Sequence, residues 1–341
     1  MNDYPIGTVL SGNRDEIERA YERFAAQPVD ETRLHTGPYP YSMFETTLGG
    51  RASASGPGTY EGHPSTLTFA PCAEPGWWID RTDQPEQFPI PVSVRSVWNT
   101  HRNIVLRSGS AHNYLRMVEH IVAMKVGLGL DRMTVETASG DPPLFDLGNY
   151  DLVEAVDRAT MVETTTPASF FTVGEPVTFG LPGRGDFLTF LPAEPGRLGL
   201  RVDCAVDFPS AIGKQRILFD VTPETFRHGA TARTNAPLRL LVYVKTVGKL
   251  FADTRHLGYT SKNILIHGRR RYFNEPKLLH DGKSLEAVWH RATLDLLAAV
   301  ALLDGGRFCG TIVSYRSGHT QDVRLCTLLE RKGLLVPAAM H

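Results

Sequence analysis

Apolar residues near the N-terminus recur three and four positions apart. Either Ser11 or Asn13 can cap a helix there, and the apolar residues that follow share one face, namely Ile17, Ala20, Tyr21, Phe24 and Ala25. The pattern predicts a short amphipathic helix. Residues 27–41, rich in proline and polar side chains, predict a connector. The same kind of periodicity predicts further helices at residues 115–130, 151–159, 224–232 and 284–302.

A strand and its turn occur twice in the chain. LTFAP at 67–71, followed by AEPG at 73–76, recurs as LTFLP at 188–192 followed by AEPG at 193–196. In each copy apolar and polar residues alternate and a Pro-Gly turn follows, which is typical of a short β-strand and the turn at its end. A repeat this far apart indicates two copies of one domain rather than a solenoid.

The polar, proline-containing stretch at residues 164–172 is the expected domain boundary. We therefore predict an N-terminal helical extension at 1–45, one α+β domain at 46–165 and a second at 170–335. The predicted fold class is α+β, with two similar domains from an internal duplication. Each would be a sheet packed with helices, forming a sandwich with the site between the domains.

Composition narrows the class of function. With 341 residues, 42% hydrophobic and 21% charged, the chain resembles ordinary soluble proteins, and a net charge of −1 offers no field for nucleic acid. Its basic run, at 269–271, is expected to be a solvated loop, with a phosphate-binding loop as the less favoured alternative. The apolar run at 296–303 is too short to span a bilayer. These features predict a cytoplasmic protein, and they remain compatible with peripheral contact with a membrane that holds a lipid substrate.

Glu119 and His120 open an apolar helical run that ends near Gly127 and Gly129. Such a pair alone is typical of a polar helix face and does not define a metal site. Further motifs surround it in a fixed order: RASASGPG at 51–58, STLTFAP at 65–71, RTD at 81–83, SVR at 93–95, PLFD at 143–146, ART at 232–234 and SGH at 317–319. From about Thr46 onward the chain resembles the UDP-3-O-acyl-N-acetylglucosamine deacetylases, the zinc amidases of lipid A synthesis.

The resemblance implies two similar α+β domains and a zinc ion held by two His and one Asp. It also implies a Glu general base beside the first His, and a later His that stabilises the oxyanion. Carried over by motif, Glu119 is the expected base, His120 and Asp295 are expected zinc ligands, and His319 and Thr234 are expected to face the oxyanion. Amide hydrolysis requires a base that takes a proton from water, a metal ion that activates the water, and positive charge where the oxyanion forms.

The remaining zinc ligand departs from the family pattern. The family places its second His four residues before the Asp, and here that position is Arg291. His290 lies five residues before Asp295, which separates the two by ~140° on a straight helix, so it can be a ligand only if the helix contains a π-bulge. The interpretation we favour from sequence is an ion pair between Arg291 and Asp295 that fills the volume of the zinc.

Three more positions differ from the family. Ala292 follows the ligand position where the family has Lys, Ala299 replaces an Asp, and Asn235 replaces an aromatic residue after the Arg-Thr pair. In the family these groups bind substrate or orient the catalytic His, so their loss bears on the substrate more than on the fold.

Two hypotheses follow from the sequence. The first is a zinc-dependent amide hydrolase acting on an acylated amino-sugar nucleotide or a related acylated amine, with the acyl chain in an apolar groove near residues 240–244. The second is a catalytically impaired homologue that binds a sugar nucleotide, lipid or protein partner in the same cleft without zinc.

Overall fold

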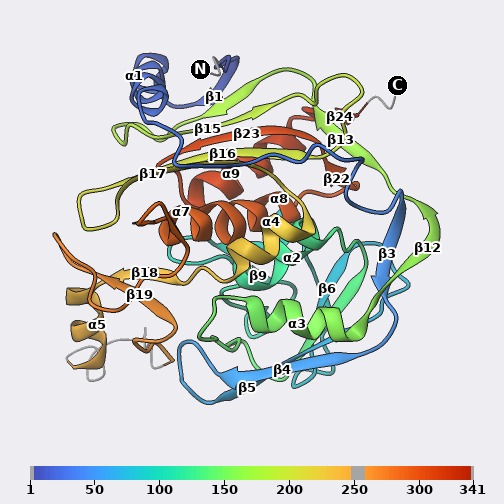
Figure 1. The fold of residues 1–341 in the computed structure, drawn as a ribbon. Coiled ribbons are helices and arrows are strands. Elements are labelled where there is room, and N and C mark those ends of the chain that lie inside the picture. The colour runs from blue at the N-terminus through green and yellow to red at the C-terminus, as the bar shows by residue number, and fades with distance from the viewer. Residues whose placement is uncertain (1–3, 247–257, 339–341) are drawn as a thin grey trace.

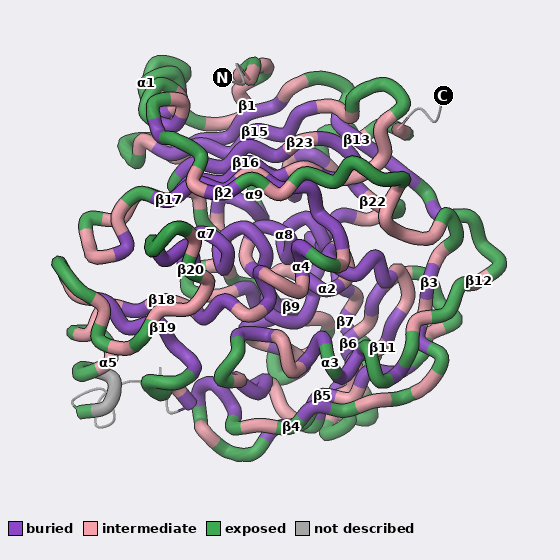
Figure 2. Tube along the Cα trace, in the orientation of Figure 1, coloured by how far each residue is buried: buried purple, intermediate pink, exposed green. Residues whose placement is uncertain are grey.

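Two β-sheets lie on either side of a layer of helices (Figure 1). The computed structural model describes residues 4–246 and 258–338. Figure 2 shows that the central helices and the inner strands are the buried part of the chain. One apolar cluster runs through both sheets and these helices, and includes Phe69, Val122, Phe190 and Leu297. No helix of the described residues is long and apolar enough to cross a membrane.

The larger sheet has seven strands. Their order is β1 (Thr8–Ser11), β14 (Val177–Phe179), β15 (Phe187–Leu191), β23 (Gly310–Tyr315), β16 (Leu200–Phe208), β17 (Gly213–Asp220) and β2 (Glu31–Arg33). β15 is buried along its whole length. This strand is therefore covered on both faces, including at Thr189, which the alternating pattern alone would have left exposed.

The second sheet has five strands, in the order β4 (Ala52–Pro57), β5 (Pro64–Ala70), β11 (Met133–Thr137), β6 (Trp77–Arg81) and β7 (Ile90–Pro91). In this sheet β11 pairs antiparallel with β5 and parallel with β6. In the larger sheet β23 likewise pairs antiparallel with β15 and parallel with β16. The repeated LTFAP and LTFLP segments fall in β5 and β15. The duplication and the domain boundaries stay predictions.

The helices agree in part with the predicted ones. They are α1 (Arg14–Ala25), α2 (Glu119–Leu128), α3 (Tyr150–Ala159), α4 (Pro223–Ala230), α5 (Leu238–Lys245), α7 (Glu286–His290), α8 (Leu297–Ala301) and α9 (His319–Arg331), with a short 3₁₀ turn at Val94–Ser96. The Asn13 side chain caps α1, as expected from sequence. The helix predicted at 284–302 is interrupted: Arg291–Leu296 form a π-helix, η2, between α7 and α8.

The remaining strands form small ribbons around the two sheets. They are β3 (Phe44–Leu48) with β12 (Met161–Pro167), β8 (Val97–Asn99) with β9 (Val105–Arg107) and β10 (Tyr114–Leu115), β13 (Phe170–Val173) with β22 (Arg307–Phe308) and β24 (Leu335–Pro337), β18 (Thr234–Pro237) with β19 (Ile264–His267), and β20 (Leu279–His280) with β21 (Lys283–Ser284). The parallel ribbon of β18 and β19 carries α5 at one end (Figure 1).

The N-terminal extension is more than a helix and a connector. β1 and β2 add to opposite edges of the seven-stranded sheet, and α1 packs its apolar face on that sheet through Ile17 and Phe24. β2 lies within the predicted connector because its backbone pairs with β17 and Glu31 accepts a hydrogen bond from the Trp289 indole at 2.9 Å. These contacts come from distant parts of the chain, so local composition did not show them.

Candidate functional site

Four segments far apart in sequence meet between the two sheets. The start of α2 supplies Glu119 and His120, the start of β18 supplies Thr234, α7 and η2 supply His290 and Asp295, and the start of α9 supplies His319. Each side chain stands at or near an end of its element. The structure thus brings together all six of the site residues predicted from sequence, including His290.

Thr234 lies between two imidazoles. Its Oγ1 is 3.0 Å from His290 Nε2 and 3.4 Å from His120 Nε2. The two rings have centroids 5.3 Å apart and are inclined by 61°. A hydroxyl has one proton to donate, so it can donate to one of these nitrogens while it accepts from the other.

Asp295 lies between His290 and His319. Its Oδ1 is 3.8 Å from His290 Nδ1 and 3.7 Å from His319 Nε2. These distances are too long for hydrogen bonds, and this buried oxygen has no hydrogen-bond partner among the described residues. Burial opposes ionisation of the Asp295 carboxyl, but the neighbouring His319 and His290 outweigh it and lower its pKa. The carboxylate is therefore available to a cation.

Glu119 is buried beside this group. Its Oε2 accepts a hydrogen bond from the Ile104 backbone N–H at 2.9 Å, which fixes the carboxyl at the first turn of α2. Burial raises the pKa of Glu119 to about 7, although the nearby His319 opposes the shift. A carboxyl that titrates near neutral pH suits a group that must both accept and release a proton.

The pKa values of the three imidazoles are shifted in different directions. Burial lowers the pKa of His120 to about 3, and the neighbouring His290 adds to the effect. Burial also lowers the pKa of His290. For His319, burial favours the neutral ring, but Asp295 and Glu119 outweigh it and raise its pKa. The shifts thus favour the neutral ring at His120 and His290 and the protonated ring at His319, and a neutral imidazole is the form that binds metal.

The favoured interpretation of Arg291 from sequence is wrong. Its guanidinium pairs with Asp322 and not with Asp295, with Nη2 2.6 Å from Asp322 Oδ1, while Nε donates to the Ser317 carbonyl at 3.0 Å. The reason is the π-helix, in which residues five apart, not four, are hydrogen-bonded along the turn. The same turn brings His290 towards Asp295, which is the alternative that the spacing left open.

Sequence reasoning missed three residues that hold the site in place. Asn149 donates from its side-chain amide to the His120 carbonyl at 2.9 Å. Asp322 and Ser317 hold Arg291 from α9 and from the loop before it. Asp322 lies three residues after His319, on the same turn of α9. That spacing could have indicated that Asp322 lies near His319, but no local sequence pattern indicates that Asp322 pairs with Arg291.

The donor types at the site fit zinc. Two imidazoles and one carboxylate are common zinc ligands, and the buried Asp295 oxygen lacks a partner, as an oxygen waiting for a cation would. The side chains do not form a closed ligand group, however. Across residues 4–246 and 258–338, no three His, Cys, Asp or Glu are arranged to hold a metal ion. As they lie, His120 and His290 both direct Nε2 to Thr234.

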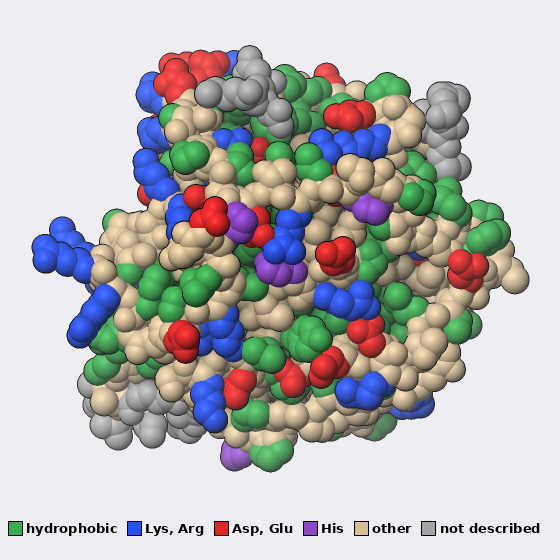
Figure 3. All heavy atoms as spheres, in the orientation of Figure 1, with side chains coloured by type: hydrophobic (Ala, Val, Ile, Leu, Met, Phe, Trp, Pro, Cys, Tyr) green, Lys and Arg blue, Asp and Glu red, His purple; other side chains and the backbone are tan. Residues whose placement is uncertain are grey.

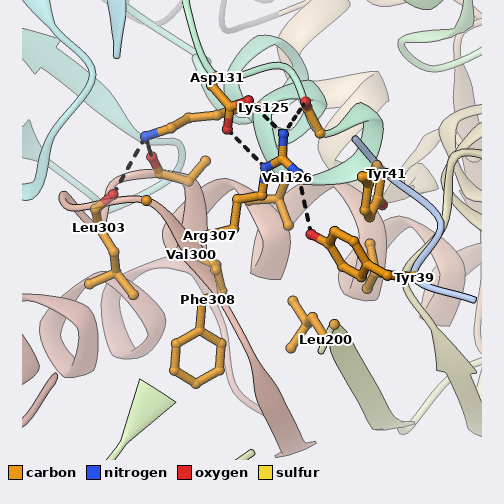
Figure 4. A pocket seen from close by; sticks show the side chains of 15 residues that line it. Tyr39, Tyr41, Lys125, Val126, Asp131, Leu200, Val300, Leu303, Arg307 and Phe308 are labelled. Atoms are coloured by element: carbon orange, nitrogen blue, oxygen red, sulfur yellow. Dashed lines mark hydrogen bonds and ion pairs between the residues drawn. The ribbon is translucent and has the colours of Figure 1, made fainter. Parts of the chain in front are cut away.

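A different pocket lies at the other end of α2 (Figure 4). There the Lys125 ammonium donates to the Ala301 carbonyl at 2.8 Å, and the Arg307 guanidinium pairs with Asp131 at 2.7 Å and contacts the Tyr39 hydroxyl. The two cations have partners within the protein. We therefore interpret this pocket as a junction that holds the N-terminal extension against α2, and not as the reaction site.

The predicted acyl groove at residues 240–244 falls on α5. Leu240 and Val242 are exposed there, and the Val244 side chain lies outside the described residues.

The family model described as LpxC, UDP-3-O-acyl N-acetylglycosamine deacetylase, matches residues 45–331. Similar curated proteins include the UDP-3-O-acyl-N-acetylglucosamine deacetylases of Brucella ovis, Brucella canis and Brucella abortus. Each is 28% identical over 284 residues, which cover 82% of this chain and 92% of the relative. The chain belongs to the UDP-3-O-acyl-N-acetylglucosamine deacetylase family, and the resemblance inferred from its motifs is confirmed.

Proposed function

We propose that this protein is a zinc-dependent amide hydrolase that removes the N-acetyl group of an acylated UDP-amino sugar, the substrate class named for its relatives. The observation that carries the proposal is the grouping of Glu119, Asp295 and His319, which come from three distant segments and share one buried site. Family membership supports the reaction type.

Glu119 is the proposed general base. It takes a proton from the attacking water as the water oxygen bonds to the amide carbonyl carbon. It then delivers that proton to the leaving nitrogen as the C–N bond breaks, so that acetic acid and a free amine are formed. The acid then loses its proton to the amine or to solvent and leaves as acetate. A pKa of about 7 supports both transfers, because neither protonation state is strongly favoured at neutral pH.

His120, His290 and Asp295 are the proposed zinc ligands. A zinc ion held there would polarise the amide carbonyl and acidify the attacking water. Low pKa values keep His120 and His290 neutral, and the pKa of Asp295 keeps it ionised. The three side chains thus have the charge states that metal binding requires.

His319 and Thr234 are the proposed partners of the oxyanion. The raised pKa of His319 favours the imidazolium, which places positive charge where negative charge develops. The Thr234 hydroxyl can donate to the same oxygen once it is released from His120 and His290. Both groups stabilise the tetrahedral intermediate more than the neutral amide.

Zinc content tests the proposal. Protein purified without added zinc is expected to contain about one zinc per chain, and a His120→Ala/Asp295→Ala variant is expected to contain none. Wild-type protein that stays empty even after zinc is offered would lack the electrophile and would refute the hydrolase.

The competing function is a catalytically impaired homologue that binds a sugar nucleotide, lipid or protein partner in the same cleft. Two observations favour it: the described residues form no closed metal group, and Ala299 stands where the family has an Asp. It predicts ligand binding without zinc and no release of acetate. Assaying acetate release and ligand binding on one zinc-loaded sample separates the two functions.

The proposal extends to location and origin. We infer a cytoplasmic enzyme, in agreement with a described chain without a membrane-spanning helix. We attribute the common strand order of the two sheets to an internal duplication, supported by the LTFAP and LTFLP segments at equivalent strands.

A further inference from the structure

Helix α5 carries apolar side chains on its solvent side. Leu240 is 42% exposed, Val242 53% and Tyr243 48%, whereas Leu238 and Leu241 are turned further inward. A surface helix of a soluble protein ordinarily has the opposite arrangement, with charged residues outward. The outward face of α5 is therefore suited to contact with something apolar.

An arginine turn lies next to this helix. Pro237 at the end of β18 is paired with His267 at the end of β19, so α5 and the turn of Arg269, Arg270 and Arg271 leave the ribbon at the same end. All three arginines are exposed. The Arg271 guanidinium lies 5.0 Å from the ring centroid of Phe273, which is itself 44% exposed.

We call residues 238–243 and 268–273 together the α5–arginine surface. These two segments contain four arginines and no Asp or Glu, in a chain whose net charge is −1. These two segments therefore carry a local excess of positive charge that the chain as a whole lacks. In Figure 3, Lys and Arg side chains project at the left margin beside hydrophobic ones, where Figure 1 draws α5 and the β18–β19 ribbon.

We propose that the α5–arginine surface docks on an anionic phospholipid bilayer. An interfacial helix inserts apolar side chains at the headgroup boundary while neighbouring cations contact lipid phosphates, and this surface presents both kinds of group side by side. The acyl chain of a bound substrate would account for the apolar residues. It would not account for three adjacent exposed arginines.

The surface adjoins the candidate site. β18 begins at Thr234, which contacts His120 and His290, and ends at Pro237, where α5 begins. A strand of this length spans about 10 Å. If the proposed deacetylase function holds, docking places the site close to a membrane from which an acylated substrate can enter. The docking proposal itself does not depend on catalysis.

Vesicle sedimentation with the full chain tests the docking. The protein is expected to bind phosphatidylglycerol vesicles at low salt, to bind phosphatidylcholine vesicles much more weakly, and to be released in about 0.5 M salt, where exposed charges are screened. Equal binding to both lipids, or none to either, would overturn the proposal.

Two sets of variants locate the surface. R269Q/R270Q/R271Q is expected to weaken binding to phosphatidylglycerol vesicles by about fivefold per arginine, or on the order of 100-fold in total. L240Q/Y243Q is expected to weaken it by about tenfold, through lost apolar insertion. The matched control R19Q/R184Q/R331Q removes the same charge from exposed positions elsewhere and is expected to bind as the wild type does.

The control decides the outcome. If R19Q/R184Q/R331Q weakens binding as much as R269Q/R270Q/R271Q, attraction is diffuse and the docking surface is wrong. All of these side chains are exposed, so folding should be preserved, and circular dichroism checks it. Because the readout is bound protein and not acetate, a failed deacetylase assay leaves the result intact.

Discussion

Two buried arginine–carboxylate pairs flank the site, and they differ in how completely they are hydrogen-bonded. Arg233 pairs with Glu286 at 2.6 Å, its other guanidinium nitrogens donate to the Lys262 and Glu275 carbonyls, and Glu286 also accepts from the Lys277 backbone N–H at 2.7 Å. This pair joins the start of β18 to the start of α7. It is a closed network with a structural role.

The second pair, Arg291 with Asp322, is incomplete. Arg291 Nη1 and Asp322 Oδ2 are buried without hydrogen-bond partners among the described residues, and so are the nearby Asp295 Oδ1 and His319 Nδ1. Unsatisfied buried polar atoms are rare in folded proteins because each reduces stability. Four such atoms lie close together here, which indicates that this region binds a ligand. The region around Arg233, whose polar atoms are hydrogen-bonded, has a structural role instead.

Glu119→Gln should have the largest effect. Loss of the proposed base is expected to reduce kcat/KM for acetate release by about 100-fold to 10,000-fold. Stability should be retained, since the glutamine oxygen can still accept from Ile104 and carries no buried charge. The matched control is Asp186→Asn, another buried carboxyl with a raised pKa that accepts a backbone hydrogen bond. Similar losses in both variants would argue against a catalytic role for Glu119.

Removing each arginine compares the two pairs directly. Arg233→Met should lower the free energy of unfolding by about 3–5 kcal/mol, because Glu286 is left as a buried unpaired charge. Arg291→Met should lower it by only about 1–3 kcal/mol. Burial already raises the pKa of Asp322, so this carboxyl can take up a proton when its partner is lost.

Urea unfolding measures both losses. The double variant Arg233→Met/Glu286→Leu controls for the buried charge and should recover much of the stability. Equal losses from Arg233→Met and Arg291→Met would mean that the two pairs do not differ in role.

His290→Ala and Arg291→His test which residue faces the proposed metal. His290→Ala should weaken zinc binding by at least about 100-fold. Loss of a residue that only hydrogen-bonds to a zinc ligand weakens binding by up to about 100-fold, and loss of a ligand itself should weaken it more. Arg291→His should bring no gain, because position 291 faces Ser317 and Asp322. Zinc titration with a competing chelator measures both. The control is His228→Ala, because the ring of His228 packs on Trp289 beside the same helix. If Arg291→His binds zinc more tightly than the wild type, position 291 faces the metal, as the α-helical spacing of the sequence suggests.

The sequence contained enough to predict the family and most helices, since motifs and helical periodicity are local signals. It also pointed to six candidate site residues that the structure brings together, and their roles stay predictions. It left the π-helix at Arg291–Leu296 open as one of two alternatives and favoured the other. That turn is paired with contacts to Ser317 and Asp322, and no local pattern links position 291 to position 322. The sequence analysis did not predict the strand β2 for the same reason, because its partners lie in β17 and at Trp289. Tertiary contacts decided both.

His267→Gln gives the smallest expected effect and tests an unsatisfied group away from the site. His267 Nδ1 is buried without a hydrogen-bond partner among the described residues, and burial lowers the pKa of the ring below its ordinary 6.5. Between the lowered pKa and about 6.5 the unfolded chain binds more protons than the folded one, so the wild type should lose stability as the pH falls below about 6.5. His267→Gln should lose less between pH 7 and pH 5.5, measured by urea midpoints, while the exposed His101→Gln should behave as the wild type does. If the His267→Gln variant loses as much stability between pH 7 and pH 5.5 as the wild type does, the fold does not keep the ring of His267 neutral.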